Sequence, residues 1–393
     1  MSADPDRLKE RTAEAVRRGR DATIDLSHRI HARPELGHEE VEASRWLAEA
    51  LTEQGYEVEA GVCDLPTAFR ARIGSGSLDV GLMAEYDALP GIGHACGHNM
   101  IASAAYATAR ALAPLADELD LTVTVLGTPA EEVLSRGGKI MMLERGAFEG
   151  VQLALMIHPS PYEHPAPQTL AATTLDVAMT GRAAHASAAP QEGVNAADAL
   201  TVAQVAIGLL RQHLRPDVRV SGITRSAGEA PNIIPDRARA EYVVRATTLD
   251  DLAEVRSRAE ACFQGGALAT GCRVELGSGI GPYAELRQDP DLAASYRENA
   301  TAAGREFAPD EAVARFLAST DAGNVSHVIP TLHPFIGLDT LPVVNHQADF
   351  AAACATPAAD DALLAGAALL AATVVDAATR PELRARLIGA GRS

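Results

Sequence analysis

The segment GLMAEYDALPGIGHACGHNM, residues 81–100, places several chemically active side chains directly after a short apolar stretch. It contains the carboxylates of Glu85 and Asp87, and a Cys-x-His pair follows at Cys96 and His98. Thiolate, imidazole and carboxylate together are typical ligands of zinc and similar transition ions. A Cys-x-His pair alone is a weak signal, because a buried thiol beside a loop histidine gives the same pattern. The segment therefore predicts part of a metal site whose remaining ligands come from elsewhere.

Three more groups of polar side chains follow apolar segments farther along the chain. Glu131 and Glu132 come after LTVTVLG, and His158 follows VQLALMI. His346 lies in LPVVNHQ, which follows the apolar segment HPFIGLD. Each feature alone has an ordinary explanation, since adjacent glutamates are usually surface charge and a lone histidine is usually structural. Together with the Cys-x-His pair they exceed the four ligands of one tetrahedral ion, so they predict two ions with a shared bridging group and water between them.

The segments that position these side chains alternate between predicted strands and helices. Alternation of helices with continuously apolar strands favours an α/β fold around a buried sheet that is mixed but largely parallel. In open α/β sheets, sites form outside the carboxyl ends of the strands, which is where the polar groups fall. We expect strands at 56–62, 67–73, 78–84, 121–127, 151–157 and 333–339, and helices at 6–31, 38–54, 100–116 and 137–148.

The pattern changes near residue 170. A strand, a long amphipathic helix, two strands, a second helix and a last strand are predicted at 169–181, 194–213, 218–228, 237–247, 249–270 and 272–277. This order is that of ferredoxin-like α+β folds. From about residue 282 the chain returns to the α/β pattern, so we expect the block to be inserted. The predicted domains are a catalytic domain formed by residues 1–169 and 282–393, and an inserted domain at residues 170–281.

Bulk properties exclude several classes of partner. The chain has 393 residues, of which 47% are hydrophobic, and its formal net charge is −18. A protein of this sign repels phosphate, so nucleic acid and anionic lipid are poor partners. The N-terminal stretch is polar and lacks the apolar core of a signal peptide. The apolar run 362–375 is shorter than the roughly 20 residues that span a bilayer, so a buried helix is expected. The five scattered cysteines suggest no disulfide framework, which favours the cytoplasm.

Two other functions are compatible with parts of this pattern. Cys96 would be the nucleophile of a cysteine hydrolase with His98 as its base, although this leaves both glutamates and the other two histidines without a role. A non-catalytic binding protein on the same fold is the second alternative, and retention of every candidate ligand argues against it. Metal analysis separates the possibilities, because a thiol enzyme works in the presence of a chelator.

The sequence resembles the dinuclear zinc aminoacylase/carboxypeptidase family of metallopeptidases. It is most similar to the amidohydrolase subfamily, which includes hippurate, indole-acetyl-amino-acid and aminobenzoyl-glutamate hydrolases, and within it to the β-alanyl-lysine-type dipeptidase branch. The motifs that carry the resemblance span nearly the whole chain. They occur in family order as DALP, HACGH, PAEE, MIHP, GRAAHAS, GEAPNIIPD, STDAGNVS and NHQADF.

The resemblance implies a set of roles at the metal site. Glu131 would be the general base, and Asp87 would be a carboxylate beside the metal site that does not bind the ions itself. Two divalent ions per chain are implied, zinc above all, with manganese or cobalt as alternatives. Asn99 stands where many relatives have aspartate, so different charge tuning is expected there. The implied metal ligands are Cys96 in the place of a bridging carboxylate, His98, Glu132, His158 and His346.

The resemblance also implies how substrate is held. His185 would polarise the scissile carbonyl, and Asn232 and Arg245 would hold the substrate carboxylate. The inserted block would be a lid and dimerisation domain, with His185 acting on the metal site of the partner subunit. The implied activity is hydrolysis of an amide bond in a dipeptide or an N-acyl or aminoacyl amino acid with a free carboxylate, by a metal-activated water and the glutamate base.

Overall fold

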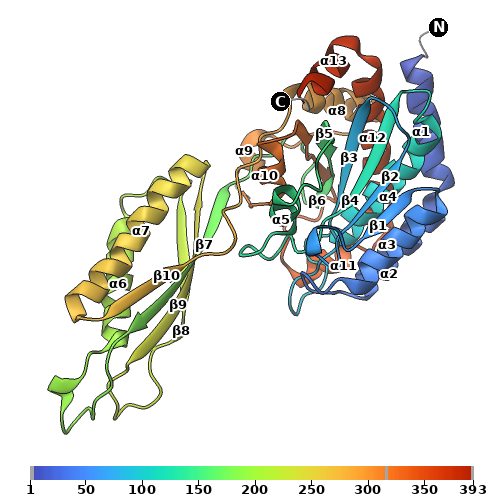
Figure 1. The fold of residues 1–393 in the computed structure, drawn as a ribbon. Coiled ribbons are helices and arrows are strands. Elements are labelled where there is room, and N and C mark those ends of the chain that lie inside the picture. The colour runs from blue at the N-terminus through green and yellow to red at the C-terminus, as the bar shows by residue number, and fades with distance from the viewer. Residues whose placement is uncertain (1–3, 315–316, 391–393) are drawn as a thin grey trace.

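The computed structural model describes residues 4–314 and 317–390, which form two parts joined side by side (Figure 1). The larger part contains a six-stranded sheet and carries both ends of the described chain. The smaller part contains a four-stranded sheet with two helices. Each sheet has its own hydrophobic core, so the parts are separately packed units.

The six-stranded sheet is mixed, in the strand order β1-β2-β4-β3-β5-β11. Its β4, β3, β5 and β11 strands run parallel, whereas β1 and β2 are antiparallel to their neighbours. Every residue of β3 and β4 is buried, because helices cover both faces. The mixed α/β class expected from the sequence is thus confirmed. The strands are β1 Glu57–Ala60, β2 Phe69–Ile73, β3 Leu78–Ala84, β4 Leu121–Gly127, β5 Leu153–Leu155 and β11 Thr331–Leu332.

Two helices rich in small residues form the centre of the larger part. α4 (His98–Leu112) buries nearly all its length, and α12 (Pro357–Thr379) packs against it and against α1 and α8. α12 is long and apolar enough to cross a membrane, but most of it is buried in this core. The other helices here are α1 Pro5–Arg18, α2 Arg20–Ala32, α3 Val41–Glu53, α5 Gly138–Glu144, α8 Pro290–Ala302, α9 Asp310–Val313, α10 Ala322–Ser326, α11 Ala348–Ala353 and α13 Pro381–Ala390.

Several element boundaries differ from the sequence-based expectation. The helix expected at 6–31 is two helices, because the chain turns at Gly19, where a Cβ would lie 1.3 Å from the Nη1 atom of Arg110. The strand expected at 151–157 is shorter, and His158 instead begins β6 (His158–Ser160). β6 pairs in parallel with β12 (Phe335–Gly337) in a separate two-stranded sheet. The apolar segments therefore lie where strands were expected, but the strands that they form belong to two different sheets.

The smaller part has the strand order β10-β7-β9-β8 with all neighbours antiparallel. Helices α6 and α7 lie together on one face of this sheet (Figure 1). β8 is an edge strand, and most of its side chains are exposed. The elements are β7 Ala171–Thr180, α6 Ala196–Arg211, β8 Arg219–Ser226, β9 Arg237–Ala246, α7 Leu249–Thr270 and β10 Arg273–Gly277.

The four-stranded sheet has a near end and a far end relative to the larger part. At the near end Ala172 pairs with Arg245, and a bridge joins Ala172 to Tyr283 of the returning chain. At the far end Thr180 pairs with Arg237. Eight residues at about 3.4 Å each separate these ends by about 27 Å. The loops beyond Thr180 therefore project away from the larger part (Figure 1).

Candidate active site

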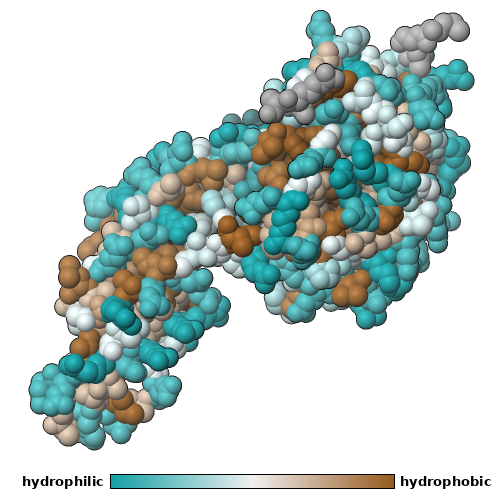
Figure 2. All heavy atoms as spheres, in the orientation of Figure 1, coloured by the Kyte–Doolittle hydropathy of each residue, from teal (hydrophilic) through white to brown (hydrophobic). Residues whose placement is uncertain are grey.

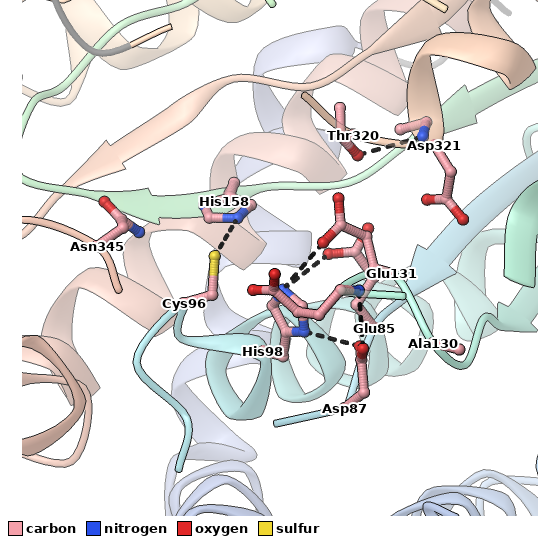
Figure 3. Close-up of polar contacts among 12 residues, drawn as sticks. Glu85, Asp87, Cys96, His98, Ala130, Glu131, His158, Thr320, Asp321 and Asn345 are labelled. Carbon is pink, nitrogen blue, oxygen red and sulfur yellow. Dashed lines mark hydrogen bonds and ion pairs between the residues drawn. The ribbon is translucent and has the colours of Figure 1, made fainter. Parts of the chain in front are cut away.

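The predicted metal ligands converge beside the carboxyl ends of the parallel strands. The Sγ atom of Cys96 lies 3.4 Å from the Nε2 atom of His158 (Figure 3). The Nε2 atom of His346 lies 3.2 Å from the Oε1 atom of Glu132. These four residues line a cavity of about 420 Å³, which Glu131 also lines. The structure therefore brings together side chains from four segments that the sequence keeps apart.

His98 is the fifth predicted ligand, and Asp87 fixes its orientation. The Nδ1 atom of His98 lies 2.9 Å from the Oδ1 atom of Asp87 and donates to it, which leaves Nε2 facing the cluster (Figure 3). The Oδ2 atom of Asp87 accepts from the backbone N–H of Glu132. Burial alone would lower the pKa of His98, but Asp87 raises it well above its usual value. Asp87 thus links two of the ligand segments without facing the cavity.

Glu131 and Glu132 follow a turn of the backbone and face different partners. Ala130 has a positive φ of 59°, a left-handed conformation that is uncommon outside glycine. Glu131 is buried, and its Oε2 atom lies 3.9 Å from the Nε2 atom of His98. Burial and the charges of Glu85 and Glu132 raise the pKa of Glu131 well above its usual range. A carboxylate in this environment readily holds a proton, as a general base must after it accepts one.

The spacing of the donor atoms suits metal ions. Bonds of about 2.0 Å to nitrogen or oxygen and 2.3 Å to sulfur, at tetrahedral angles, place ligand atoms about 3.3–3.6 Å apart. The 3.4 Å between Cys96 and His158 and the 3.2 Å between Glu132 and His346 fall close to these values. Two groups of three share Cys96, one with His98 and His158, the other with Glu132 and His346. The residues present therefore fit two ions with Cys96 between them.

The charge of the site also calls for cations. Five carboxylates less one ammonium leave four negative charges in one buried cluster when all these groups are ionised. Burial of uncompensated charge is strongly unfavourable, and two divalent cations would offset these four charges. The Nε2 atom of His98 and the Oε1 atom of Glu132 are buried without a hydrogen-bond partner. The cluster consists of Glu85, Asp87, Glu131, Glu132, Asp321 and Lys139.

Sequence reasoning missed three members of this cluster. Glu85 was recognised as a carboxylate near the pair of histidines but received no role, and Lys139 and Asp321 received none. The Nζ atom of Lys139 lies 2.5 Å from Glu85 Oε1 and 2.6 Å from Asp321 Oδ1, and all three side chains are buried. A signal was present at Lys139, because a charged residue inside the apolar helical segment GKIMM needs a buried partner.

Two further histidines and Asn99 lie around the cluster. His333 stacks on His158 at 5.6 Å between ring centroids, and it was not predicted. His94 is buried on the other side, next to His31. Asn99 donates from Nδ2 to the Ser27 hydroxyl and to a backbone carbonyl of α11's end, so its side chain faces the helices rather than the metal ligands. The expected effect of Asn99 on charge tuning is therefore not supported by its contacts.

Arg245 lines the same cavity from the near end of the four-stranded sheet. Its Nη1 atom donates to the hydroxyl of Ser319 at 2.9 Å, and it forms no ion pair with any carboxylate in residues 4–314 and 317–390. Burial lowers its pKa from the usual value of arginine. A half-buried guanidinium without an anionic partner is ready to bind an anionic group of a ligand.

His185 and Asn232 lie at the far end of the same sheet, away from the cavity. The β-bridge between His185 and Ile233 places them side by side, and the N–H of Ala186 donates to the carbonyl of Asn232. The Nδ1 atom of His185 accepts from the N–H groups of Ser187 and Ala188, so the ring proton is on Nε2 and faces outward. Within one chain, the structure therefore does not bring Asn232 and Arg245 to the same carboxylate.

Comparisons with known proteins identify relatives of this chain. The model of Peptidase family M20/M25/M40 matches residues 81–376. The chain is 38% identical to the Xaa-Arg dipeptidase of Mus musculus, over 97% of this chain and 91% of the relative.

Solved structures share the fold. A putative aminohydrolase from methicillin-resistant Staphylococcus aureus superposes with a TM-score of 0.76 and 21% identity, covering 94% of this chain and 99% of that one. A dinuclear metal-binding peptidase of the M20 family from Bacillus subtilis gives a TM-score of 0.62 and 21% identity, covering 90% and 98%. Family relatives are hydrolases that cleave amide bonds, so this chain is an enzyme of that kind. The chain belongs to peptidase family M20/M25/M40.

Proposed function

We propose that this enzyme hydrolyses the amide bond of dipeptides, or of N-acyl or aminoacyl amino acids, that carry a free carboxylate. The observation that carries this proposal is the convergence of two groups of metal-ligand side chains on one cavity that also contains Glu131 and Arg245. A dipeptide is the favoured substrate, because the Xaa-Arg dipeptidase relative matches nearly the whole chain.

Cys96, His98, Glu132, His158 and His346 would hold the two divalent ions, with Cys96 shared between them. Sulfur and nitrogen donors favour zinc, and manganese or cobalt are the alternatives. Burial and His333 lower the pKa of His158 to about 3, so its ring is neutral and its Nε2 lone pair is available. Two bound ions would lower the pKa of a shared water to about 7 and polarise the scissile carbonyl.

Glu131 is the proposed general base. It takes the proton of the attacking water and then gives it to the leaving amine. Asp87 holds His98 through Nδ1 and the segment of Glu132 through its backbone N–H, so it fixes the geometry of two ligands. Arg245 would bind the substrate carboxylate, with Ser319 orienting the guanidinium.

His185 and Asn232 are proposed to act on the active site of a second copy of the chain. The sheet separates them from their own cavity by about 27 Å, which no side chain spans. The outward Nε2–H of His185 is a suitable donor to a carbonyl oxygen that develops negative charge. Asn232 of one subunit would then lie near Arg245 of the other, so that both hold one carboxylate.

The smaller part offers a surface for such a dimer. Val202, Val205 and Leu209 are exposed on one face of α6, and Ile223 is exposed on the edge strand β8 beside it. Pairing through this surface would cover both the apolar stripe and the open strand edge. Elsewhere, hydrophilic residues cover most of the visible face, with scattered hydrophobic spots (Figure 2). We propose that residues 170–281 form this lid and dimerisation domain, and that residues 1–169 and 282–393 form the catalytic domain of a cytoplasmic homodimer.

The cysteine-hydrolase alternative agrees less well with the site. Burial and the charge of Glu132 raise the pKa of the Cys96 thiol well above its usual value, whereas a nucleophile needs the thiolate. The Sγ atom of Cys96 also lies 3.4 Å from the Nε2 atom of His158, so Cys96 is not paired with His98 alone. The mechanism would also leave the buried carboxylates without compensating cations.

Metal content and substrate screening test the proposal. Purified protein should contain about two divalent ions per chain, and removal of the ions by a chelator should abolish hydrolysis of dipeptides, with recovery upon addition of zinc, manganese or cobalt. A panel of dipeptides, N-acyl amino acids and their amidated forms then identifies the substrate class. Full activity in metal-free protein would end the metal mechanism.

A further inference from the structure

The two carboxylate oxygens of Glu85 lie in different surroundings, and a purely structural role accounts for only one of them. Glu85 directly follows β3, and its carboxylate is completely buried. Its Oε1 atom lies 2.5 Å from the ammonium of Lys139. Its Oε2 atom lies 3.5 Å from the Nε2 atom of His98 (Figure 3). Glu85 Oε2 has no hydrogen-bond partner. One oxygen is thus held by a cation and the other faces a predicted metal ligand.

The atoms that meet at this point are all electron donors. His98 donates a hydrogen bond from Nδ1–H to Asp87, so Nε2 is the ring nitrogen that can bind a metal ion. The Oε2 atoms of Glu85 and Glu131 lie 3.5 Å and 3.9 Å from that nitrogen. All three side chains are buried, and each offers one ligand atom to a group compact enough to hold an ion. Lone pairs that face one another in a buried site require a cation between them.

The spacing favours a metal ion over a shared proton. A strong hydrogen bond between a charged nitrogen and a carboxylate is about 2.7–2.9 Å long, well below the 3.5 Å between His98 and Glu85. Two ligands of one tetrahedral ion, each about 2.0 Å from it, lie about 3.3 Å apart. The distance between His98 and Glu85 is therefore that of two ligands of the same ion.

Lys139 and Asp321 support Glu85 in the manner of groups around a metal ligand. The backbone N–H and the ammonium of Lys139 both bond Asp321, at 2.8 Å and 2.6 Å. This pairing joins the start of α5 to the start of α10 and fixes the ammonium beneath Glu85. Carboxylates that bind metal ions usually have a polar partner at their other oxygen, and the ion pair with Lys139 provides one at Glu85 Oε1.

We propose that Glu85 is a ligand of the ion that binds His98, through Oε2, and that Lys139 and Asp321 are positioning residues that hold it there. This inference rests on the proposed dinuclear function and adds a sixth protein ligand to it. The ion held by Cys96, His98 and His158 would then also bind Glu85, whereas Cys96, Glu132 and His346 would hold the second ion.

The rival explanation is that Glu85 only neutralises Lys139. Glu85 and Asp321 would then share one ammonium as a structural ion pair, and removal of Glu85 would affect folding stability but not the ions. Glu163 provides a matched control for that explanation. It is also a buried carboxylate bonded to a cation, at 2.6 Å from Arg305, and it belongs to none of the groups of possible metal ligands in the described chain.

Metal affinity measured with Zn²⁺ and Co²⁺ tests the proposal. We expect apo wild type to bind two ions, and Glu85→Gln to bind one of them on the order of 100-fold more weakly, with the other little changed. The visible spectrum of the Co²⁺ form should change with the loss of an oxygen ligand. Glu163→Gln should bind both ions as wild type does. Wild-type affinities and an unchanged Co²⁺ spectrum in folded Glu85→Gln would overturn the assignment.

A second variant keeps the test decisive if Glu85→Gln does not fold. Glu85→Asp retains the charge beside Lys139 but withdraws the carboxylate by one methylene. A ligand role predicts weaker binding of one ion in this variant, whereas a counter-ion role predicts wild-type binding. Apo wild type that takes up no ions would contradict the proposed function itself, so that result is distinct from a failure of Glu85 alone.

Discussion

The larger part of the molecule buries charged side chains beneath its cavity, whereas residues 171–277, all of which the structure describes, bury none. The larger part places carboxylates, imidazoles and an ammonium within one cluster. The smaller part keeps its core apolar and carries its candidate functional residues at the two ends of one sheet. Both arrangements serve one proposed site, but they depend on different partners.

The difference concerns what completes each set of residues. The buried carboxylates of the larger part outnumber the single ammonium among them, so bound cations would offset their negative charge. His185 and Asn232 of the smaller part lie away from the cavity of their own chain, and in the proposed dimer they would reach the cavity of the second chain. Under the proposed function, one part would be completed by metal ions and the other by a second copy of the chain.

The sharpest test of the larger part compares two adjacent residues with different proposed roles. Glu131 is the proposed general base, and Glu132 is a proposed metal ligand. Glu131→Gln should keep both ions and lose about 10³-fold in kcat, because it removes the proton acceptor and not a metal donor. Glu132→Gln should lose affinity for one ion as well as activity. Metal analysis and kinetics on the same preparations check both results. Activity retained in both variants would contradict the roles given to this pair.

The dependence of the smaller part on a second chain is tested by mixing two inactive variants. His185→Ala and Glu131→Gln should each be inactive, and exchange of subunits should restore roughly a quarter of wild-type activity. Half of randomly paired dimers are then hybrids, and each hybrid has one site without either defect. Exchange is followed independently with differently tagged chains. Exchange without any recovered activity would show that His185 acts within its own chain or not at all.

Arg245 lies where the two parts meet, and its substitution tests how the smaller part contributes to substrate binding. The expected effect is smaller than those of the preceding variants. Arg245→Lys should raise KM about 10-fold for substrates with a free carboxylate, since lysine cannot bind a carboxylate with two parallel bonds. Amidated substrates should react slowly with wild type and change little in the variant. Steady-state kinetics on matched acid and amide substrates measure this effect. Equal rates for acid and amide would remove the carboxylate from the proposed recognition.

The positions of most site residues were predictable because parallel strands end at one edge of a sheet. Cys96, Glu132, His158 and His346 follow apolar segments whose ends meet there, and the structure brings them within ligand distance. The order of strands and helices in the inserted block was also predictable. Its apolar residues alternate in the strands and recur every three to four residues in the helices. These features depend on local patterns, and local patterns are what a single sequence displays.

The remaining features depend on contacts between distant segments. Lys139 and Asp321 are 182 residues apart, and nothing near either residue shows that they pair. The orientation of Asn99 depends on Ser27 and on the carbonyl of Cys354, so a motif position alone did not reveal it. The pairing of β6 with β12 likewise joins segments from opposite sides of the inserted block. Packing and charge balance in the folded protein determine such long-range contacts.

The position of the inserted block also has a consequence for the order of folding. The four-stranded sheet is continuous in sequence from β7 to β10, whereas β5 gains its neighbour β11 only after the whole block has been made. Contacts that are local in sequence close at a smaller entropic loss than distant ones. During synthesis, the block can therefore complete its core while the edge of β5 is still open. The six-stranded sheet beside the candidate metal ligands is completed only after β11 has been made.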